Sequence, residues 1–289
     1  MVQAIDVRLD DGRVLRAYDS GADAANGADA ASRSDAAAGP VLVWHHGSPQ
    51  TGAPLEPVLA AAAARGIRVL SYGRPSYGGS SPNPGRDVAS AAADAAAVAD
   101  AFGVGRFAAM GASGGGPHAL AGAALLPERV IAVVTLAGIA PYTDAFDWFS
   151  GMRSPGGLLA AREGRERRAA FAEVEEFDPE QFLPADFAAL DGAWSALGAD
   201  VAASEAFGND GLIDDDVAFT RPWGFELEDV RVPVLLVQGE GDRVVPRRHA
   251  AWMLSRLPDA TLWMRLDDGH VSVLHTVPDT MDWLLDHAR

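Results

Sequence analysis

From residue 41 onward, short continuous apolar runs alternate with segments whose apolar residues recur at helical spacing. The apolar runs occupy residues 41–45, 67–72, 106–110, 130–138, 232–239 and 261–266. Strands that are apolar at every position are buried on both faces, and their alternation with helices is typical of a parallel sheet covered on both sides. The sequence therefore predicts an α/β fold with a mostly parallel central sheet and helices on both faces.

The first 40 residues follow a different pattern. "QAIDVRL" and "RVLRAYD" alternate apolar and polar residues on either side of "DDG", which predicts an antiparallel β-hairpin at the edge of the sheet. Residues 20–39 contain no large apolar side chain, so we interpret this segment as a low-complexity loop.

The alternation is interrupted between residues 138 and 232, where no strand pattern is found. The stretches 158–177 and 186–207 are helix-like, and residues 142–225 carry 13 of the 22 aromatic side chains. So many aromatic residues indicate an apolar face that covers part of the sheet's edge. We predict a helical cap over residues 141–225 on an α/β core formed by residues 1–140 and 226–289.

The composition narrows the range of partners and compartments. A net charge of −17 disfavours nucleic acids and anionic membrane surfaces. The absence of cysteine excludes disulfides and thiolate chemistry. No signal peptide or transmembrane segment is recognisable, because the N-terminus lacks a basic start and an apolar core and the longest weakly polar run is broken by glycines and Pro117. We expect a cytoplasmic protein with a small-molecule substrate, and the oligomeric state is left open.

The segment "GASGGG", residues 111–116, places Ser113 among four glycines between a predicted strand and a predicted helix. Glycine is unfavourable inside either element, so this density indicates a forced backbone conformation. "GASGG" fits the G-x-S-x-G pattern in the strand–turn–helix context that the pattern requires, in which the serine hydroxyl is exposed at the end of the strand. A phosphate-binding turn is the alternative, but its glycine spacing and lysine are missing.

A serine hydroxyl needs a base before it becomes a useful nucleophile. His270, in "RLDDGHVSV", directly follows the last predicted strand and is our first candidate, with His275 one helical turn later as the second. His249 and His287 fall within predicted helices, and His118 lies inside the helix after Ser113, so we interpret these three as surface or packing residues.

The base in turn needs a carboxylate that holds its tautomer. Asp242, in "VQGEGDRVVP", follows the preceding strand and lies 28 residues before His270, which fits one helix and one strand between neighbouring strand ends. Asp144 is the less favoured alternative. Asp267 and Asp268 are closer in sequence, but a neighbour in the same loop rarely faces the imidazole correctly.

An acyl-transfer site also needs donors for a developing oxyanion. "HHGSPQTG", residues 45–52, follows another strand, so the backbone N–H of Ser48 is expected beside that of Gly114. The pair His45 and His46 lacks a neighbouring carboxylate and is interpreted as structural, so no metal site is predicted. Tyr77, in "GRPSYGGSS", is a candidate for the acyl side of the pocket or for packing under the cap.

The order Ser113, Asp242, His270 is that of the α/β-hydrolase fold. The chain resembles this family over nearly its whole length, through "HGSP", "GRPSYGGSS", "GASGGGP", "PVLLVQGEGDRVVP" and "DDGHVSVL". It is similar to the capped branch of esterases, proline iminopeptidases and cofactor-free haloperoxidases. The resemblance implies the nucleophile Ser113, the base His270, its partner Asp242 and oxyanion donors at Ser48 and Gly114, with no cofactor. It disfavours carbon–halogen and epoxide cleavage, since relatives with those activities carry Asp at the nucleophile position.

These features favour a serine hydrolase that acts on a small or medium, largely neutral carboxylic ester. Trp148, Phe149, Trp194 and Trp223 of the cap are candidates for the walls of its pocket. A second hypothesis is an aminopeptidase or amidase, which needs a cap carboxylate to hold the substrate amine. The candidates for that role are otherwise interpreted as solvated helix faces, and they are Glu175, Glu176, Asp214, Asp215 and Asp216. A third hypothesis is a receptor or regulator that keeps the three residues with little turnover.

Overall fold

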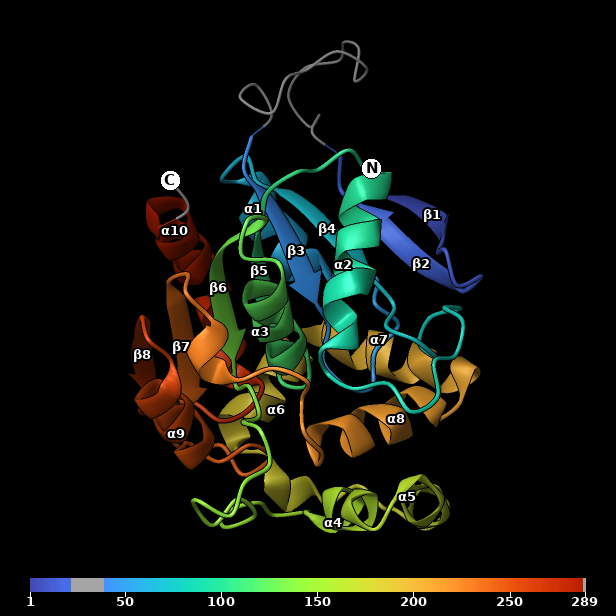
Figure 1. Cartoon of the computed structure of the whole chain (residues 1–289). Coiled ribbons are helices and arrows are strands. Elements are labelled where there is room, and N and C mark those ends of the chain that lie inside the picture. Colours follow the sequence, from blue (N-terminus) through green and yellow to red (C-terminus); the bar gives the residue numbers. More distant parts are fainter. Residues whose placement is uncertain (22–38, 288–289) are drawn as a thin grey trace.

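The sheet of the computed structural model, which describes residues 1–21 and 39–287, has eight strands in the order β1-β2-β4-β3-β5-β6-β7-β8 (Figure 1). β1 pairs antiparallel with β2 and β2 antiparallel with β4, whereas every other neighbouring pair is parallel. This arrangement confirms the predicted fold class and the N-terminal hairpin. The strands are β1 (Gln3–Arg8), β2 (Val14–Asp19), β3 (Val41–His45), β4 (Arg68–Tyr72), β5 (Phe107–Ala112), β6 (Val130–Leu136), β7 (Val234–Gly239) and β8 (Ala260–Arg265). Most of the predicted loop 20–39 lies outside the described residues.

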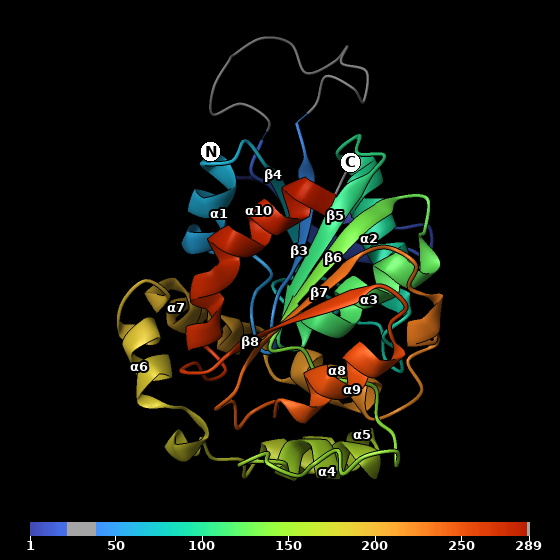
Figure 2. The ribbon, with the colours of Figure 1, turned by 90° about the vertical axis from the view of Figure 1, so that its left-hand side faces the viewer.

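Two hydrophobic clusters, one on each face of the sheet, form the main core. Successive residues of a strand point to opposite faces, and in β3 Val41 and Val43 join one cluster while Leu42 and Trp44 join the other. Both sets are buried, which explains why the parallel strands are apolar at every position. Figures 1 and 2 show the helices that cover the faces. They are α2 (Ser90–Ala101), α3 (Gly115–Leu125) and α9 (Arg248–Arg256) with the first cluster, and α1 (Glu56–Ala63) and α10 (Val277–His287) with the second.

A helical segment is inserted between β6 and β7. Its α-helices are α4 (Gly156–Arg162), α5 (Arg165–Ala172), α6 (Pro184–Asp191), α7 (Ser195–Ser204) and α8 (Asp210–Phe219). In both views these helices lie beyond the edge of the sheet at which the parallel strands end (Figures 1 and 2). We call residues 141–225 the helical insertion. None of the described helices is long and apolar enough to cross a membrane.

Each helix-like stretch of the insertion contains two α-helices instead of one. Gly164 separates α4 from α5 with a φ of 117°, which L-residues with a side chain rarely adopt. Gly192 ends α6 and thereby separates it from α7. The shorter helices let the insertion bend around the edge of the sheet.

Candidate active site

Ser113 occupies a sharp turn between β5, which ends at Ala112, and α3, which begins at Gly115. Its φ is 51°, a left-handed conformation that is uncommon for serine. A Cβ on Gly111 would lie 2.2 Å from the carbonyl oxygen of Gly115, and one on Gly115 would lie 2.0 Å from that of His45. The glycines around Ser113 are therefore needed because strand, turn and helix pass too close together for side chains.

Ser113, His270 and Asp242 form one hydrogen-bonded chain. His270 Nε2 lies 3.0 Å from Ser113 Oγ, and its Nδ1 lies 2.9 Å from Asp242 Oδ2. Asp242 follows β7 and His270 follows the neighbouring β8, so three strand ends bring these side chains together. A carboxylate accepts from Nδ1–H, which leaves Nε2 as the acceptor for the serine hydroxyl.

Asp242 is fixed by more than its contact with the imidazole. Its Oδ1 accepts from the backbone N–H groups of Val244, at 2.8 Å, and Val245, at 2.9 Å. Its Oδ2 also accepts from Gln238 Nε2 at 3.0 Å, and the carboxylate is fully buried. With both oxygens occupied, the carboxylate can face the imidazole in only one orientation.

The electrostatic surroundings act on His270 in two directions. Its burial disfavours the imidazolium and by itself would lower the pKa of His270. The charge and hydrogen bond of Asp242 outweigh the burial, so the pKa of His270 is raised. The site thus stabilises a proton on His270.

The alternative bases and acids have their contacts elsewhere. His275 is half exposed, with its Nε2 3.3 Å from the Arg265 guanidinium and 3.6 Å from the carboxylate of Asp268. Asp144 is exposed and accepts from the Tyr142 hydroxyl at 2.9 Å. Of the sequence candidates, the structure therefore brings His270 and Asp242 to Ser113.

The loop after β3 lies against the turn of Ser113. A Cβ on Gly47 would lie 3.7 Å from Ser113 Cβ, and one on Gly114 would lie 2.6 Å from Ser48 Oγ. Ser48 and Gly114 are thus neighbours beside the serine, although they come from separate strand ends. The two residues expected to donate to an oxyanion therefore lie next to each other.

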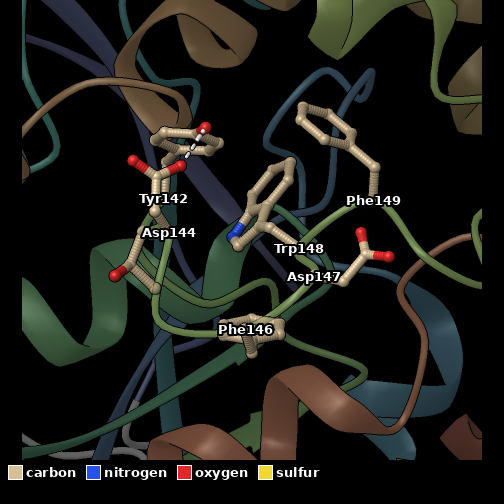
Figure 3. Close-up of a pocket in the computed structure, with 7 residues that line it drawn as sticks. Tyr142, Asp144, Phe146, Asp147, Trp148 and Phe149 are labelled. Carbon is tan, nitrogen blue, oxygen red and sulfur yellow. Dashed lines mark hydrogen bonds between the residues drawn. The ribbon is translucent and has the colours of Figure 1, made fainter.

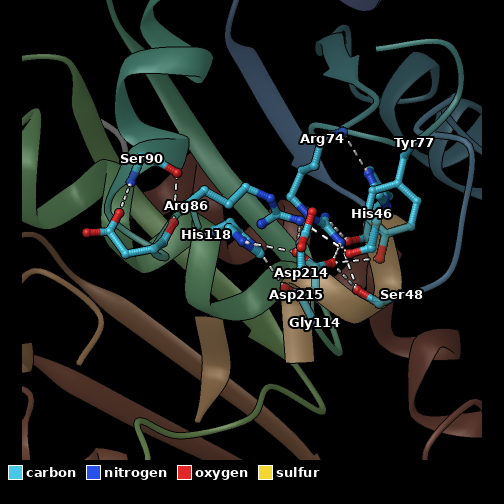
Figure 4. Close-up of polar contacts among 12 residues, drawn as sticks. His46, Ser48, Arg74, Tyr77, Arg86, Ser90, Gly114, His118, Asp214 and Asp215 are labelled. Carbon is cyan, nitrogen blue, oxygen red and sulfur yellow. Dashed lines mark hydrogen bonds and ion pairs between the residues drawn. The ribbon is translucent and has the colours of Figure 1, made fainter. Parts of the chain in front are cut away.

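A buried polar network lies behind this loop, with Asp215 of α8 at its centre (Figure 4). The sequence named Asp215 only as a candidate for holding a substrate amine or as part of a solvated helix face. Asp215 Oδ2 accepts from Ser48 Oγ at 2.6 Å, from Arg74 Nη2 at 2.7 Å and from the Tyr77 hydroxyl at 2.8 Å. Its Oδ1 lies 2.6 Å from Arg86 Nη2. Asp215 and both arginine side chains are at most 1% exposed.

The solvated-face interpretation of the acidic run at residues 214–216 is wrong, because all three carboxylates are buried. The sequence did hold a sign of this burial, because apolar residues flank the acidic run on both sides in "LIDDDVAF". Burial alone would raise the pKa of Asp215, but Arg74 and Arg86 outweigh it and hold that pKa well below its usual range.

Three histidines behind the site are neutral structural residues. His46 donates from Nδ1 to the Gly47 carbonyl at 2.6 Å and accepts the Arg74 N–H at Nε2. Burial, aided by Arg74, lowers the pKa of His45 to about 3 and that of His46 well below its ordinary value. His118 is also buried, with its Nδ1 2.7 Å from the Gly114 carbonyl. Among the described residues, no three His, Asp or Glu side chains are grouped so that they could hold a metal ion.

A cavity of about 460 Å³ opens beside Ser113 and His270. Its walls are mostly apolar and come from both the core and the insertion, among them Trp44, Leu136, Phe182, Trp194, Val201 and Leu212. Trp194 was one of the predicted wall residues.

A polar cluster also lines the cavity and consists of Arg168, Glu175 and Asp216. Arg168 Nε lies 2.6 Å from Asp216 Oδ2 and its Nη2 lies 2.9 Å from Glu175 Oε2. Burial raises the pKa of Asp216 to about 7 in spite of Arg168. Near neutral pH the net charge of the cluster therefore lies between 0, when Asp216 is protonated, and −1, when it is ionised.

Four predicted wall residues are not among the described residues that line this cavity. Tyr77 is turned into the buried network and bonds Asp215. Trp148 packs edge-on against His249 and donates to the Ala140 carbonyl at 3.0 Å. Trp148 and Phe149 also line a separate surface hollow (Figure 3). Trp223 is buried and donates to the carbonyl of Phe219, the last residue of α8, at 3.3 Å. None of these four side chains forms a wall of the cavity beside Ser113. For Tyr77 the contact with Asp215 agrees with the alternative of packing under the insertion.

Comparison with known proteins identifies the family. A family model of the alpha/beta hydrolase fold matches residues 40–275, which is most of the chain. The chain belongs to the alpha/beta hydrolase fold family. A curated relative, the pimeloyl-[acyl-carrier protein] methyl ester esterase of Aromatoleum aromaticum, is 43% identical over 68 residues. That match covers 23% of this chain and only 27% of the relative.

Solved structures extend the likeness to the whole chain. An esterase from Exiguobacterium antarcticum superposes with a TM-score of 0.70 at 17% identity, covering 99% of both chains. An esterase from Thermogutta terrifontis gives a TM-score of 0.69 at 17% identity, covering 99% of this chain and 100% of the other. A bromoperoxidase from Bacillus anthracis gives 0.68 at 19% identity, covering 98% and 99%. At such low identities these structures establish the alpha/beta hydrolase fold of the chain alone.

Proposed function

We propose that this alpha/beta hydrolase is a serine hydrolase that cleaves a small or medium, largely neutral carboxylic ester. The observation that carries the proposal is the chain from Ser113 Oγ through the imidazole of His270 to the buried Asp242. It meets the geometric requirement for nucleophile, base and orienting acid, because both hydrogen bonds are about 3 Å long or shorter. The methyl ester esterase among the relatives accords with it.

In the proposed mechanism Ser113 Oγ attacks the ester carbonyl carbon while its proton moves to His270 Nε2. The carbonyl oxygen becomes an oxyanion that accepts from the N–H groups of Ser48 and Gly114. Collapse of this tetrahedral intermediate breaks the bond to the alcohol oxygen, which takes the proton from His270. Water then attacks the acyl-enzyme, with His270 as its base, and releases the acid and the free serine. Asp242 stabilises the imidazolium in both halves of the reaction.

The cavity sets the expected substrate class. In this proposal residues 141–225 act as the cap over the sheet edge, and their apolar side chains bury the hydrocarbon part of the ester. Each buried CH₂ group adds about 0.8 kcal/mol of binding free energy. Activity should therefore rise over the first few acyl carbons and fall once the chain exceeds the cavity.

A second candidate is an amidase or aminopeptidase, and the cluster of Arg168, Glu175 and Asp216 favours it. Two carboxylates and one guanidinium line the same cavity as Ser113, and the cluster has no net positive charge to repel an ammonium group. A substrate with a free amine near its scissile bond would find acceptors there. Glu176 and Asp214 are not among the described residues that line the cavity.

One substrate series distinguishes the candidates. The purified protein is assayed with p-nitrophenyl esters of increasing acyl length and with proline and alanine p-nitroanilides. A maximum at short or medium esters supports the esterase, whereas inert esters with rapid anilide cleavage support the aminopeptidase. If neither is cleaved while a fluorophosphonate still labels Ser113, a receptor or a more specialised hydrolase is indicated.

Three variants test the residues themselves. Ser113→Ala should abolish fluorophosphonate labelling, and labelling that survives would overturn the assignment of the nucleophile. His270→Ala should reduce turnover about as severely, because the members of such a chain act as a unit. His275→Ala is its matched control, and a larger loss there would show that the wrong base has been chosen.

A further inference from the structure

Two aspartates of the helical insertion make polar contacts with residues 46–51 of the core, the segment that carries the proposed donor Ser48. We call this segment the oxyanion loop. We infer that two aspartates of the insertion, Asp200 on α7 and Asp215 on α8, are positioning residues that hold the oxyanion loop in its reactive geometry. The inference rests on the proposed function, since it assigns these residues a role in the same reaction.

Asp215 holds the loop at Ser48. Its carboxylate accepts from Ser48 Oγ at 2.6 Å, and Arg74 Nη2 binds the same hydroxyl at 2.8 Å. Arg74 also donates to the carbonyl oxygens of His46 and, at 3.2 Å, of Gly47. Three consecutive residues of the loop are therefore tied to one buried ion pair whose anion comes from the insertion.

Asp200 holds the loop farther along. Its Oδ2 accepts from Gln50 Nε2 and from the Thr51 N–H, both at 3.1 Å, and its Oδ1 accepts from the Thr51 hydroxyl. Gln50 Oε1 in turn accepts from the Gly47 N–H at 2.6 Å. Asp200 is thus linked through Gln50 to Gly47, the residue before Ser48.

The histidine that binds the second proposed donor residue lies near the same carboxylate. His118 Nε2 lies 3.8 Å from Asp215 Oδ1, and its Nδ1 bonds the carbonyl oxygen of Gly114 at 2.7 Å. Figure 4 shows Ser48, Gly114 and His118 grouped around Asp215. Asp215 accordingly bonds the side chain of one donor residue and lies beside, without a hydrogen bond, the histidine that binds the other.

These contacts have a consequence for catalysis. Oxyanion stabilisation depends on donors held about 2.7–3.1 Å from the developing charge, and small displacements are costly. The loop makes its side-chain contacts with Asp200 and Asp215 only while α7 and α8 are seated on the core. The insertion would therefore determine kcat as well as forming the walls of the pocket.

The test compares wild type with Ser48→Ala, Asp200→Asn, Asp215→Asn and the control Asp214→Asn. Ser48→Ala keeps the backbone N–H but removes the hydroxyl that Asp215 binds. Asp214 neighbours Asp215 on α8, but its carboxylate pairs with the half-exposed Arg165. Turnover of a p-nitrophenyl ester, the rate of fluorophosphonate labelling, Tm and amide hydrogen exchange of residues 46–51 are measured for each protein.

We expect Ser48→Ala and Asp200→Asn to lower kcat about 10- to 100-fold with KM within a few-fold, a smaller loss than that from removing a donor outright, about 10²–10³-fold. Exchange of residues 46–51 should accelerate in both variants, while Asp214→Asn stays close to wild type. Asp215→Asn leaves two buried arginines without their anion and could prevent folding. In that case Ser48→Ala and Asp200→Asn alone test whether the two aspartates hold the oxyanion loop.

Folded Ser48→Ala and Asp200→Asn proteins with unchanged kcat would overturn the inference, as would unchanged exchange of the loop. A loss confined to KM would show that the aspartates shape only the pocket. If the wild type neither turns over esters nor reacts with the fluorophosphonate, the proposed function fails, and the exchange rates still decide whether the two aspartates hold the loop.

Discussion

His270 illustrates how a single buried carboxylate tunes a base at the residue scale. Only the neutral imidazole can accept the Ser113 proton, so protonated His270 is inactive in the proposed mechanism. Because Asp242 raises the pKa of His270, the imidazole stays protonated to a higher pH than an ordinary histidine. Activity should therefore fall as the pH drops through this raised pKa.

The expected pH profile follows from the upward shift of the pKa of His270. kcat/KM for a neutral ester should rise with pH along one acidic limb whose midpoint lies above the ordinary histidine value of about 6.5. A rate profile from pH 5 to 9 at constant ionic strength checks it, since kcat/KM reports the free enzyme. A midpoint clearly below 6.5 would mean that burial, and not Asp242, dominates at His270.

Asp242 can be tested against Asp144 at the same scale. Asp242→Asn should lower kcat by about 10³–10⁴-fold, because the amide favours the wrong imidazole tautomer and carries no charge. Asp144→Asn should change kcat little, since Asp144 is exposed and bonds only Tyr142 in the contacts described here. Equal losses in a steady-state assay of both variants would contradict the choice of acid.

The structure brings together the three site residues that were chosen because they follow strands. Ser113, Asp242 and His270 were all placed by that rule, because the ends of parallel strands meet at one edge of a sheet. The place of Asp215 at the centre of a buried network was missed for a physical reason. Its partner Arg74 lies 141 residues away in the sequence, and an acidic run on a helix has the same local pattern whether it faces water or a buried arginine.

At the scale of elements, the position of Ser113 depends on how closely β5, α3 and the loop after β3 approach one another. A Cβ on Gly115 would lie 2.0 Å from the carbonyl oxygen of His45, closer than any side chain can sit without movement of the backbone. Gly115→Ala should therefore lower the free energy of unfolding by about 1–3 kcal/mol or more. Urea denaturation measures it.

Gly198 of α7 is the matched control, because a Cβ there meets no atom within 4 Å. Gly198→Ala should leave the free energy of unfolding unchanged or raise it by up to about 1 kcal/mol through helix propensity. If both substitutions had the same effect, the close approach at Gly115 would not be what requires glycine.

The insertion shows that the periodicity of apolar residues does not predict where a helix ends. Its helix-like stretches continue through Gly164 and Gly192, and a glycine within a helical pattern is sometimes tolerated and sometimes ends the helix. The aromatic count indicated an apolar segment over the edge of the sheet, and the helices of the insertion lie beyond that edge (Figures 1 and 2). It could not say which rings line the cavity, because Trp148 and Trp223 are used to pack the insertion onto the core.

The whole molecule carries a net charge of −17, which bears on the substrate it can attract. Such a field repels anions and lowers their local concentration near the site. The cavity does not reverse this effect, because the cluster of Arg168, Glu175 and Asp216 has no net positive charge. Long-range and local electrostatics therefore both favour a neutral ester over an anionic one.

This preference should depend on salt. The test compares p-nitrophenyl butyrate with the anionic p-nitrophenyl hydrogen succinate, which have similar acyl lengths. At low salt kcat/KM should favour the butyrate, and the ratio should narrow as the Debye length falls from about 30 Å at 10 mM to about 3 Å at 1 M salt. A ratio that does not move would assign the discrimination to contacts inside the cavity, and a preference for the succinate at low salt would mean that Arg168 binds carboxylates in spite of the field.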